Sequence, residues 1–193
     1  EPYHYLQERG MLAHVQQEVL SGMNIAWTPE LERHLGQFGT LPRDVENSVG
    51  QNFERNQVIL ESITRQPDEW TTLLFASSVE HARALAAELS YYGIASRPIS
   101  GATDPALRRR YIEQFRDGDI RVLTNYAVLT QGFDAPKVQA VYVTRPTFSP
   151  NLYQQMIGRG LRGPLNGGSE QVLIVNVADN LEQYGGQLAF HHF

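Results

Sequence analysis

The chain has 193 residues, a formal net charge of -5 and an apolar fraction of 41%, which are ordinary values for one globular domain with an appendage. It contains no cysteine, so disulfides, zinc–thiolate sites and cysteine nucleophiles are excluded, and a cytoplasmic location is predicted. Its acidic balance argues against a protein that coats nucleic acid in bulk, and no apolar run approaches the roughly 18 residues of a membrane span.

The first 66 residues lack strong strand-like runs and predict mostly helix. Thr28 before Pro29 is typical of a helix start, because threonine caps free N–H groups and proline fits the first turn. The sequence GTLPRD at residues 39–44 predicts a turn. Helices are predicted at residues 11–20, from Pro29 onward and at residues 52–65. Residues 1–66 are therefore predicted to be a helical extension or linker packed on the main domain, residues 67–193.

From Trp70 onward, short apolar runs alternate with helical patterns. Five buried strands are predicted, at residues 71–77, 94–99, 120–124, 138–144 and 171–177. Helices are predicted between them, at residues 79–89, 103–115 and 151–161, and a short helix is predicted after Asp179. Strands that are apolar on both faces and alternate with helices are typical of an α/β fold, with a mostly parallel sheet and helices on both faces.

Ligands of such sheets bind beyond the carboxyl ends of the strands. Three candidate segments follow predicted strands, and a fourth belongs to the helix before the last strand. They are SSVEH (77–81), SGATD (100–104), NYAVLTQGFDAP (125–136) and GRGLRG (158–163).

In the last of these segments, Arg159 and Arg162 lie three residues apart. On a helix this spacing puts both guanidinium groups on one face, where they repel each other unless an anion lies between them. Guanidinium forks suit phosphate oxygens. The alternative is structural: Arg162 pairs with a surface carboxylate, and Gly160 is a packing glycine.

The third segment combines Thr130, Gly132 and Asp134 after a strand that ends in Thr124-Asn125. Short hydroxyls and a glycine let a nucleic-acid backbone approach closely, and the aspartate can accept a hydrogen bond from a ribose hydroxyl. A tight connection with a capping aspartate is an equally good interpretation. The three arginines at 108–110 are either a solvated helix face or phosphate contacts.

A single lysine, Lys137, limits how phosphate can be bound. A phosphate-binding P-loop needs the pattern G-x-x-x-x-G-K-[ST], and Lys137 lies in DAPKVQA without those glycines. The chain therefore carries no P-loop, and a P-loop kinase or small-molecule nucleotide hydrolase is excluded. If this chain binds a phosphate, it must use residues other than a P-loop.

The four segments, in this order, resemble motifs IV, V and VI of superfamily 2 helicases, over roughly residues 71–178. The last segment matches the pattern Q-x-x-G-R-x-x-R at Gln155, Gly158, Arg159 and Arg162. The resemblance implies the second RecA-like domain of a helicase, which has a P-loop NTPase fold without the P-loop.

The resemblance also implies a mechanism in which ATP binds between two RecA-like domains. The first domain supplies the P-loop and the Asp-Glu box that holds Mg²⁺, and the second supplies arginines. Arg159 and Arg162 are then expected to reach the γ-phosphate, with Arg162 as the arginine finger. Gln155 is expected to sense the phosphate or the attacking water. The expected ATP-binding residues are Gly132, Asp134 and Gly158, and the expected nucleic-acid contacts are Ser77, Ser78, Gly101, Thr124, Asn125 and Thr130.

Two departures from DEAD-box RNA helicases favour DNA over RNA as the substrate. Gln155 replaces the histidine that opens this motif there, and the loop between Thr124 and Gly132 is longer. Both features look more like restriction-enzyme motors and excision-repair translocases. The one Asp-Glu pair, Asp68-Glu69, lies in a predicted turn, so an Asp-Glu box is missing as well as the P-loop.

The chain is therefore expected to be a monomeric part of a longer protein, to need the N-terminal RecA-like domain of that protein as its partner, and to be inactive alone. The alternatives are a non-catalytic nucleic-acid-binding or docking module, or a domain of an RNA helicase.

Overall fold

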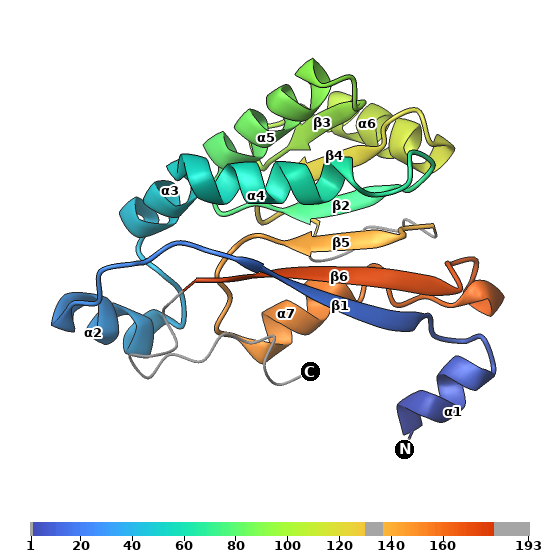
Figure 1. Cartoon of the computed structure of the whole chain (residues 1–193), viewed down its shortest axis with the longest axis horizontal. Coiled ribbons are helices and arrows are strands. Elements are labelled where there is room, and N and C mark those ends of the chain that lie inside the picture. Colours follow the sequence, from blue (N-terminus) through green and yellow to red (C-terminus); the bar gives the residue numbers. More distant parts are fainter. Residues whose placement is uncertain (1, 130–136, 180–193) are drawn as a thin grey trace.

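The computed structural model describes residues 2–129 and 137–179, and Figure 1 shows their arrangement. Six parallel strands form one sheet in the order β1-β6-β5-β2-β4-β3. The strands are β1 (His14–Ser21), β2 (Thr72–Phe75), β3 (Ser96–Ile99), β4 (Val122–Asn125), β5 (Ala140–Val143) and β6 (Gln171–Ala178). The predicted α/β fold with a mostly parallel sheet is confirmed.

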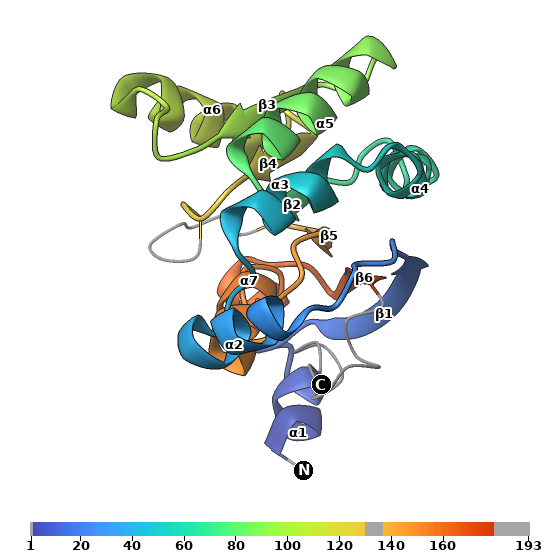
Figure 2. The same cartoon turned by 90° about the vertical axis from the view of Figure 1, so that its left-hand side faces the viewer.

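Helices cover both faces of this sheet (Figures 1 and 2). They are α1 (Pro2–Glu8), α2 (Pro29–Phe38), α3 (Arg43–Gln51), α4 (Phe53–Thr64), α5 (Val79–Tyr91), α6 (Pro105–Asp117) and α7 (Pro150–Ile157), followed by the short 3-10 helix η1 (Pro164–Asn166). One core cluster joins α4 and α5 to the sheet, and the other joins α6 and α7 to its opposite face. Every residue of β2, β4 and β5 is buried, which explains why these strands read as continuous apolar runs.

Local signals set the ends of two helices, and the start of the first is the one predicted at Thr28-Pro29. Thr28 caps α2 by accepting a hydrogen bond from the Leu31 N–H at 3.2 Å. Asp104 caps α6, whose first residue is proline, and Gly118 ends that helix with a φ of 84°. Because a positive φ is strained for residues with a side chain, glycine is suited to this position.

The prediction of a helix at residues 11–20 is wrong, because residues His14–Ser21 form the edge strand β1. This strand pairs along its whole length with β6, from His14 opposite Gln171 to Ser21 opposite Ala178. The partner lies about 157 residues away in the chain, so backbone pairing that is invisible locally overrides the local pattern. The division of the chain at residue 66 stays a prediction, but the part before it supplies a strand to the sheet.

Two further boundaries differ from the predictions. Helix α3 begins at Arg43, inside the predicted turn, and α7 ends at Ile157 instead of continuing to Leu161. Glycines at 158 and 160 weaken helix continuation, and the backbone turns there. The helix predicted after Asp179 lies outside the described residues.

A small third core lies beyond the carboxyl ends of the strands, where α2 and α3 are seen in Figure 1. Its buried members come from α2, α3 and their flanking segments: Ile25, Leu31, Leu41 and Val49. The residues before α4 therefore cover part of the sheet edge at which parallel α/β proteins usually bind ligands.

Candidate functional site

The carboxyl ends of β2 and β4 hold four of the predicted nucleic-acid contacts in buried positions. Ser77 lies against His81, with 2.8 Å between the Ser77 Oγ and the His81 Nδ1, and Ser78 caps α5. Thr124 donates from Oγ1 to the Ala82 carbonyl at 2.7 Å, and Asn125 donates from Nδ2 to the Leu74 carbonyl at 3.0 Å. These side chains are used by the fold, and their contact with nucleic acid stays a prediction.

Gly101 lies in a different environment, on the exposed turn between β3 and α6. A Cβ atom built on it would meet no atom within 4 Å. Nothing in the described fold therefore requires glycine there, which leaves room for an approaching molecule.

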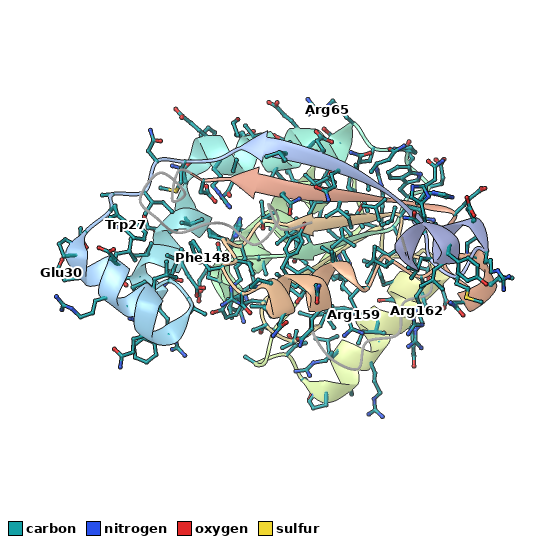
Figure 3. The ribbon with its side chains drawn as sticks, turned by 90° about the horizontal axis from the view of Figure 1, so that it is seen from below. Trp27, Glu30, Arg65, Phe148, Arg159 and Arg162 are labelled. Atoms are coloured by element: carbon teal, nitrogen blue, oxygen red, sulfur yellow. The ribbon has the colours of Figure 1, made fainter. Side chains whose placement is uncertain are left out.

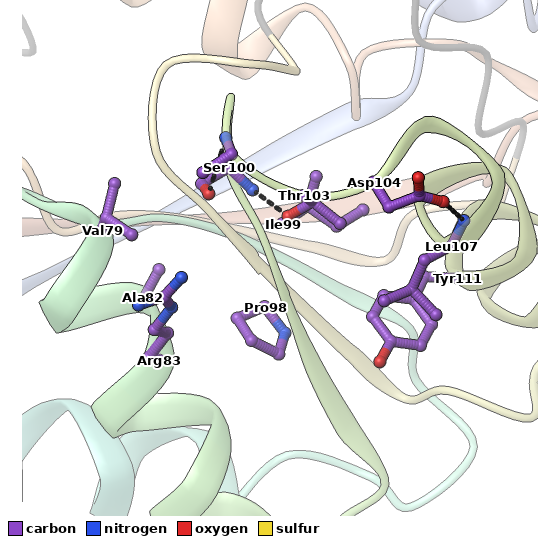
Figure 4. Close-up of a pocket in the computed structure, with 11 residues that line it drawn as sticks. Val79, Ala82, Arg83, Pro98, Ile99, Ser100, Thr103, Asp104, Leu107 and Tyr111 are labelled. Carbon is purple, nitrogen blue, oxygen red and sulfur yellow. Dashed lines mark hydrogen bonds between the residues drawn. The ribbon is translucent and has the colours of Figure 1, made fainter.

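A hollow of about 260 Å³ lies beside this turn, between α5, β3 and α6 (Figure 4). Val79, Pro98, Ile99, Leu107 and Tyr111 give it apolar walls, and Arg83 lies on its α5 side. Arg83 is exposed, and sequence reasoning missed it because it lies inside a helical pattern without a motif.

Arg159 and Arg162 follow α7, in a segment held tightly by its glycines. A Cβ on Gly160 would lie 2.7 Å from a Val172 methyl and 2.9 Å from a Val141 methyl. A Cβ on Gly163 would lie 2.3 Å from the Gly10 carbonyl oxygen. Gly160 is thus a packing glycine, and close packing fixes the backbone that carries both arginines.

The segment before β1 fixes Arg162 further. Arg162 forms an antiparallel bridge with Leu12, and the Gly163 N–H donates to the Met11 carbonyl at 3.1 Å. The Ala13 N–H donates to the Leu161 carbonyl at 3.0 Å. Residues 11–13, predicted as helix, therefore hold the arginine segment in place as extended chain.

The two arginines lie away from the candidate segments at residues 77–81 and 100–104. Gly160 packs on the second residue of β5 and on the second residue of β6, so Arg159 and Arg162 lie near the amino ends of these strands. In Figure 3, Trp27 lies toward one end of the molecule, and Arg159 and Arg162 lie on the other side of its centre. Arg162 is exposed and Arg159 is half-buried, and Gln155 and Gly158 next to them are exposed. Thr130, Gly132 and Asp134 lie outside the described residues.

Buried polar groups tie α4 to Asp179, directly after β6, and to α5. The guanidinium of Arg55 donates from Nε to Asp179 Oδ1 at 2.9 Å, and both side chains are fully buried. His81 contacts Asn56, with 3.0 Å between His81 Nε2 and Asn56 Oδ1. Burial, and second the positive charge of Arg55, lower the pKa of His81 to about 3, so the imidazole is neutral.

A second set of polar side chains, which the sequence does not predict, lies at the carboxyl edge of the sheet. Glu46 of α3 accepts a hydrogen bond from the Tyr126 hydroxyl at 3.0 Å and pairs with Arg145 at 3.0 Å. Burial, followed by the negative charge of Glu46, raises the pKa of the Tyr126 phenol. No motif marks Glu46, because its partners are separated from it by 80 and 99 residues.

Two negative findings apply to residues 2–129 and 137–179. In that part of the chain, no three His, Asp or Glu side chains are grouped so that they could hold a metal ion. Within the same ranges, every helix is too short or too polar to cross a bilayer.

The family described as the helicase conserved C-terminal domain matches residues 54–163. "Putative ATP-dependent helicase IRC3" of Saccharomyces cerevisiae is 35% identical over 119 residues, which are 60% of this chain and 17% of that protein. "Putative mitochondrial ATP-dependent helicase irc3" of Schizosaccharomyces pombe is 40% identical over 113 residues, 58% of this chain and 18% of that protein. "ATP-dependent RNA helicase DBP10" of Gibberella zeae is 27% identical over 128 residues, 66% of this chain and 14% of that protein. The chain thus spans less than a fifth of these relatives.

Solved structures of other proteins share the fold. A fragment of a putative HsdR subunit of a type I restriction enzyme from Vibrio vulnificus has a TM-score of 0.64 at 17% identity, over 92% of this chain and 34% of that chain. The E. coli DEAD-box protein SrmB has a TM-score of 0.61 at 20% identity, over 74% of this chain and 81% of that chain.

Proposed function

The chain belongs to the helicase conserved C-terminal domain family, and from this premise we propose that it is the second motor domain of an ATP-dependent helicase or translocase, within a longer protein. The observation that carries the proposal is the pair Arg159 and Arg162, held by close-packed glycines next to the exposed Gln155. A rigid backbone that presents cations near the surface suits an anion supplied from outside the domain.

In this proposal, Arg159 and Arg162 donate to the γ-phosphate of ATP, and Arg162 is the arginine finger. Gln155 senses the phosphate or the attacking water. The guanidinium groups stabilise charge that develops on the transferred phosphoryl group, a contribution of roughly 10³–10⁵ in rate. Gly160 and Gly163 contribute indirectly, because their packing fixes the backbone that carries both arginines.

ATP and Mg²⁺ require groups beyond the described residues of this chain. The chain has no P-loop for the β-phosphate, and its described residues include no carboxylate cluster for a metal. The arginine side chains of this segment suit a phosphate. The described residues offer no group of carboxylates that would hold Mg²⁺. We therefore assign both to an N-terminal RecA-like domain of the same protein, and we expect this chain alone not to hydrolyse ATP.

We place nucleic acid at the carboxyl edge of the sheet, on the side of β3. Gly101 leaves space there, and the exposed guanidinium of Arg83 borders the neighbouring hollow. The cation of Arg83 and the open turn at Gly101 would allow a phosphate backbone to bind at this place. The proposed contacts of Ser77, Ser78, Thr124 and Asn125 require backbone groups or a local rearrangement, because their side chains are engaged within the fold.

DNA is the proposed substrate, on the strength of Gln155 and the long loop before Gly132. RNA is the second candidate, because proteins named as RNA helicases are also among the relatives. A docking module without motor activity is the third, and it gives no role to Arg159 and Arg162.

The test uses the protein that joins this chain to its N-terminal motor domain. ATP hydrolysis is measured without nucleic acid and with single-stranded DNA, duplex DNA or RNA. We expect DNA to stimulate turnover, and Arg162→Ala to lower the stimulated kcat by roughly 10³ or more. The control is Arg65→Ala, because Figure 3 shows Arg65 on a different side of the molecule from Arg159 and Arg162.

If only RNA stimulates ATP hydrolysis, the proposed motor function stands, and its substrate is RNA instead of DNA. Full activity of Arg162→Ala would leave the docking module as the better interpretation. ATP turnover by this chain alone would contradict the assignment of ATP to a second domain.

A further inference from the structure

Three side chains from distant parts of the chain meet beyond the carboxyl ends of β4 and β5. Glu46 comes from α3, Tyr126 directly follows β4, and Arg145 lies two residues after β5. Tyr126 donates from its hydroxyl to Glu46 Oε2 at 3.0 Å, and Arg145 donates from Nε and Nη2 to Glu46 Oε1 at 3.2 and 3.0 Å. The Arg145 guanidinium also lies 5.2 Å from the centre of the Tyr126 ring. We call these three residues the Glu46 cluster.

Two members of the Glu46 cluster, Glu46 and Arg145, are shielded from solvent, and Tyr126 is half-buried. Glu46 is 4% exposed, and the side chain of Arg145 in the ion pair is 14% exposed. Both carboxylate oxygens of Glu46 are used, one for each partner. A buried carboxylate with complete hydrogen bonding holds its partners in one geometry, since any movement leaves a charge unpaired.

The residue after Tyr126 has an unusual backbone. Ala127 has a φ of 58°, and among the described residues it is the only non-glycine residue with a positive φ. Such a conformation is strained for an L-residue with a side chain and persists where its neighbours are fixed. Tyr126 is fixed on one side by Glu46, and Leu129 is fixed on the other side in the core between α6 and α7.

The position of this strain connects it to the proposed motor. Residues 126–129 lead directly into the segment that begins at Thr130 and carries Gly132 and Asp134. Helix α3, which provides Glu46, lies outside the part of the chain that matches the helicase family, residues 54–163. A side chain from outside the matched sequence thus holds Tyr126, which precedes a segment to which nucleotide and nucleic-acid contacts are assigned.

We propose that Glu46 is a positioning residue that holds the backbone of residues 126–129 in its strained conformation and thereby sets how strongly nucleic acid stimulates ATP turnover. The proposal rests on the motor function proposed above. Glu46 contacts neither ATP nor nucleic acid in this account, and it acts through Tyr126. Helix α3 accordingly contributes to the coupling through Glu46.

A different role for Glu46 would have the opposite effect on the binding of nucleic acid. If the Glu46 carboxylate occupied a place that a nucleic-acid phosphate takes on binding, it would mask Arg145, and its removal would tighten binding. The burial of Glu46 and its second bond, to Tyr126, favour positioning.

The experiment compares Glu46→Gln, Ala127→Gly and the double variant in the protein that contains both motor domains. Glu61→Gln serves as a matched control, because Glu61 is exposed on α4 and its side chain has no partner in the described structure. We measure kcat without nucleic acid and with saturating DNA or RNA, and the concentration for half-maximal stimulation. Glu46→Gln should lower the maximal stimulation by roughly two- to thirty-fold and leave the unstimulated kcat unchanged.

Ala127→Gly separates positioning from general destabilisation. Glycine adopts a positive φ without strain, so the double variant should regain at least half of the lost stimulation. A merely structural loss at Glu46 would not be repaired by a glycine at position 127. Unchanged stimulation in Glu46→Gln, absence of repair in the double variant, or tighter binding of nucleic acid would each overturn the proposal.

Hydrogen exchange provides a readout that does not depend on activity. In the absence of ligands, the amides of residues 126–129 should exchange faster in Glu46→Gln than in Glu61→Gln, and Ala127→Gly should reverse the increase. If no nucleic acid stimulates the wild-type protein, the motor function fails and the coupling proposal fails with it, while exchange still decides whether Glu46 holds the backbone. If stimulation is normal and exchange is unchanged, only the positioning role fails.

Discussion

Gly160→Ala tests whether close packing holds the arginine segment. The added Cβ would lie 2.7 Å from the Cγ2 of Val172 and 2.9 Å from the Cγ2 of Val141, closer than carbon atoms approach without strain. Overpacking of this kind costs about 1–3 kcal/mol, and the lower backbone entropy of alanine in the unfolded chain offsets about 0.4–1 kcal/mol. We expect a net loss of about 1 kcal/mol, or a melting temperature about 3 °C lower for a chain of this size.

The assay is thermal unfolding followed by circular dichroism, together with nucleic-acid-stimulated ATPase activity in the two-domain protein. Gly36→Ala is the control, because a Cβ at Gly36, inside α2, would meet no atom within 4 Å. In an open helix position, alanine should stabilise by about 0.5–1 kcal/mol. The two glycine replacements should therefore shift the melting temperature in opposite directions.

A double-mutant cycle then identifies the atoms responsible. Val172→Ala removes the nearer methyl group, so Gly160→Ala should cost less in that background, with a coupling energy of at least about 0.5 kcal/mol. Strictly additive effects, or a higher melting temperature for Gly160→Ala, would refute the packing argument. Loss of ATPase activity with unchanged stability would assign Gly160 to the site itself instead of to its support.

Two further predictions concern the buried groups at the carboxyl edge. Asp179→Asn should cost about 3–5 kcal/mol in the free energy of unfolding, because it leaves the fully buried charge of Arg55 uncompensated, and adding Arg55→Met should recover part of that loss in a denaturant titration. His81, with a folded-state pKa lowered to about 3 and an unfolded value near 6.5, binds a proton more readily when the chain unfolds. Its contribution to stability is therefore complete above pH 6.5 and is lost toward pH 3, by about 1.4 kcal/mol per pH unit, whereas His81→Gln should flatten this dependence. An Asp179→Asn variant as stable as the wild type, or an equally steep acid dependence without His81, would contradict these assignments.

Sequence patterns predict the elements whose determinants are local. Helix α6 has its capping aspartate, its first-turn proline and its terminal glycine within 15 residues, and the structure contains each of them in that role. Strand β2 is a continuous apolar run because both faces of the sheet are covered, so its burial is also visible locally. The family resemblance also depends on short local motifs. It therefore does not depend on the elements that the sequence predicts wrongly, such as β1.

The features that the sequence does not predict depend on partners far away in the chain. Strand β1 is largely exposed, and only its pairing with β6 defines it as a strand. In the sequence, Glu46 cannot be told from a glutamate on the surface. Its contacts with Tyr126 and Arg145 are visible only in the structure. The buried states of Ser77 and Thr124 are equally invisible, because short hydroxyl side chains suit both a ligand contact and an internal hydrogen bond. Sequence reasoning therefore finds the motifs and not the supports around them.

The topology separates the two proposed sites along the strands. Arg159 and Arg162 lie near the amino ends of β5 and β6, whereas Gly101 follows the carboxyl end of β3. Strands β4 and β5 are both parallel to β2, which lies between them, so the chain from Asn125 to Ala140 must return from the carboxyl edge to the amino edge. A four-residue strand is about 13 Å long, so the carboxyl and amino edges are about that far apart at β4. Glu46 holds Tyr126 at the carboxyl edge, and the packing of Gly160 holds the arginine segment at the amino edge, so Glu46→Gln and Gly160→Ala perturb the two edges separately.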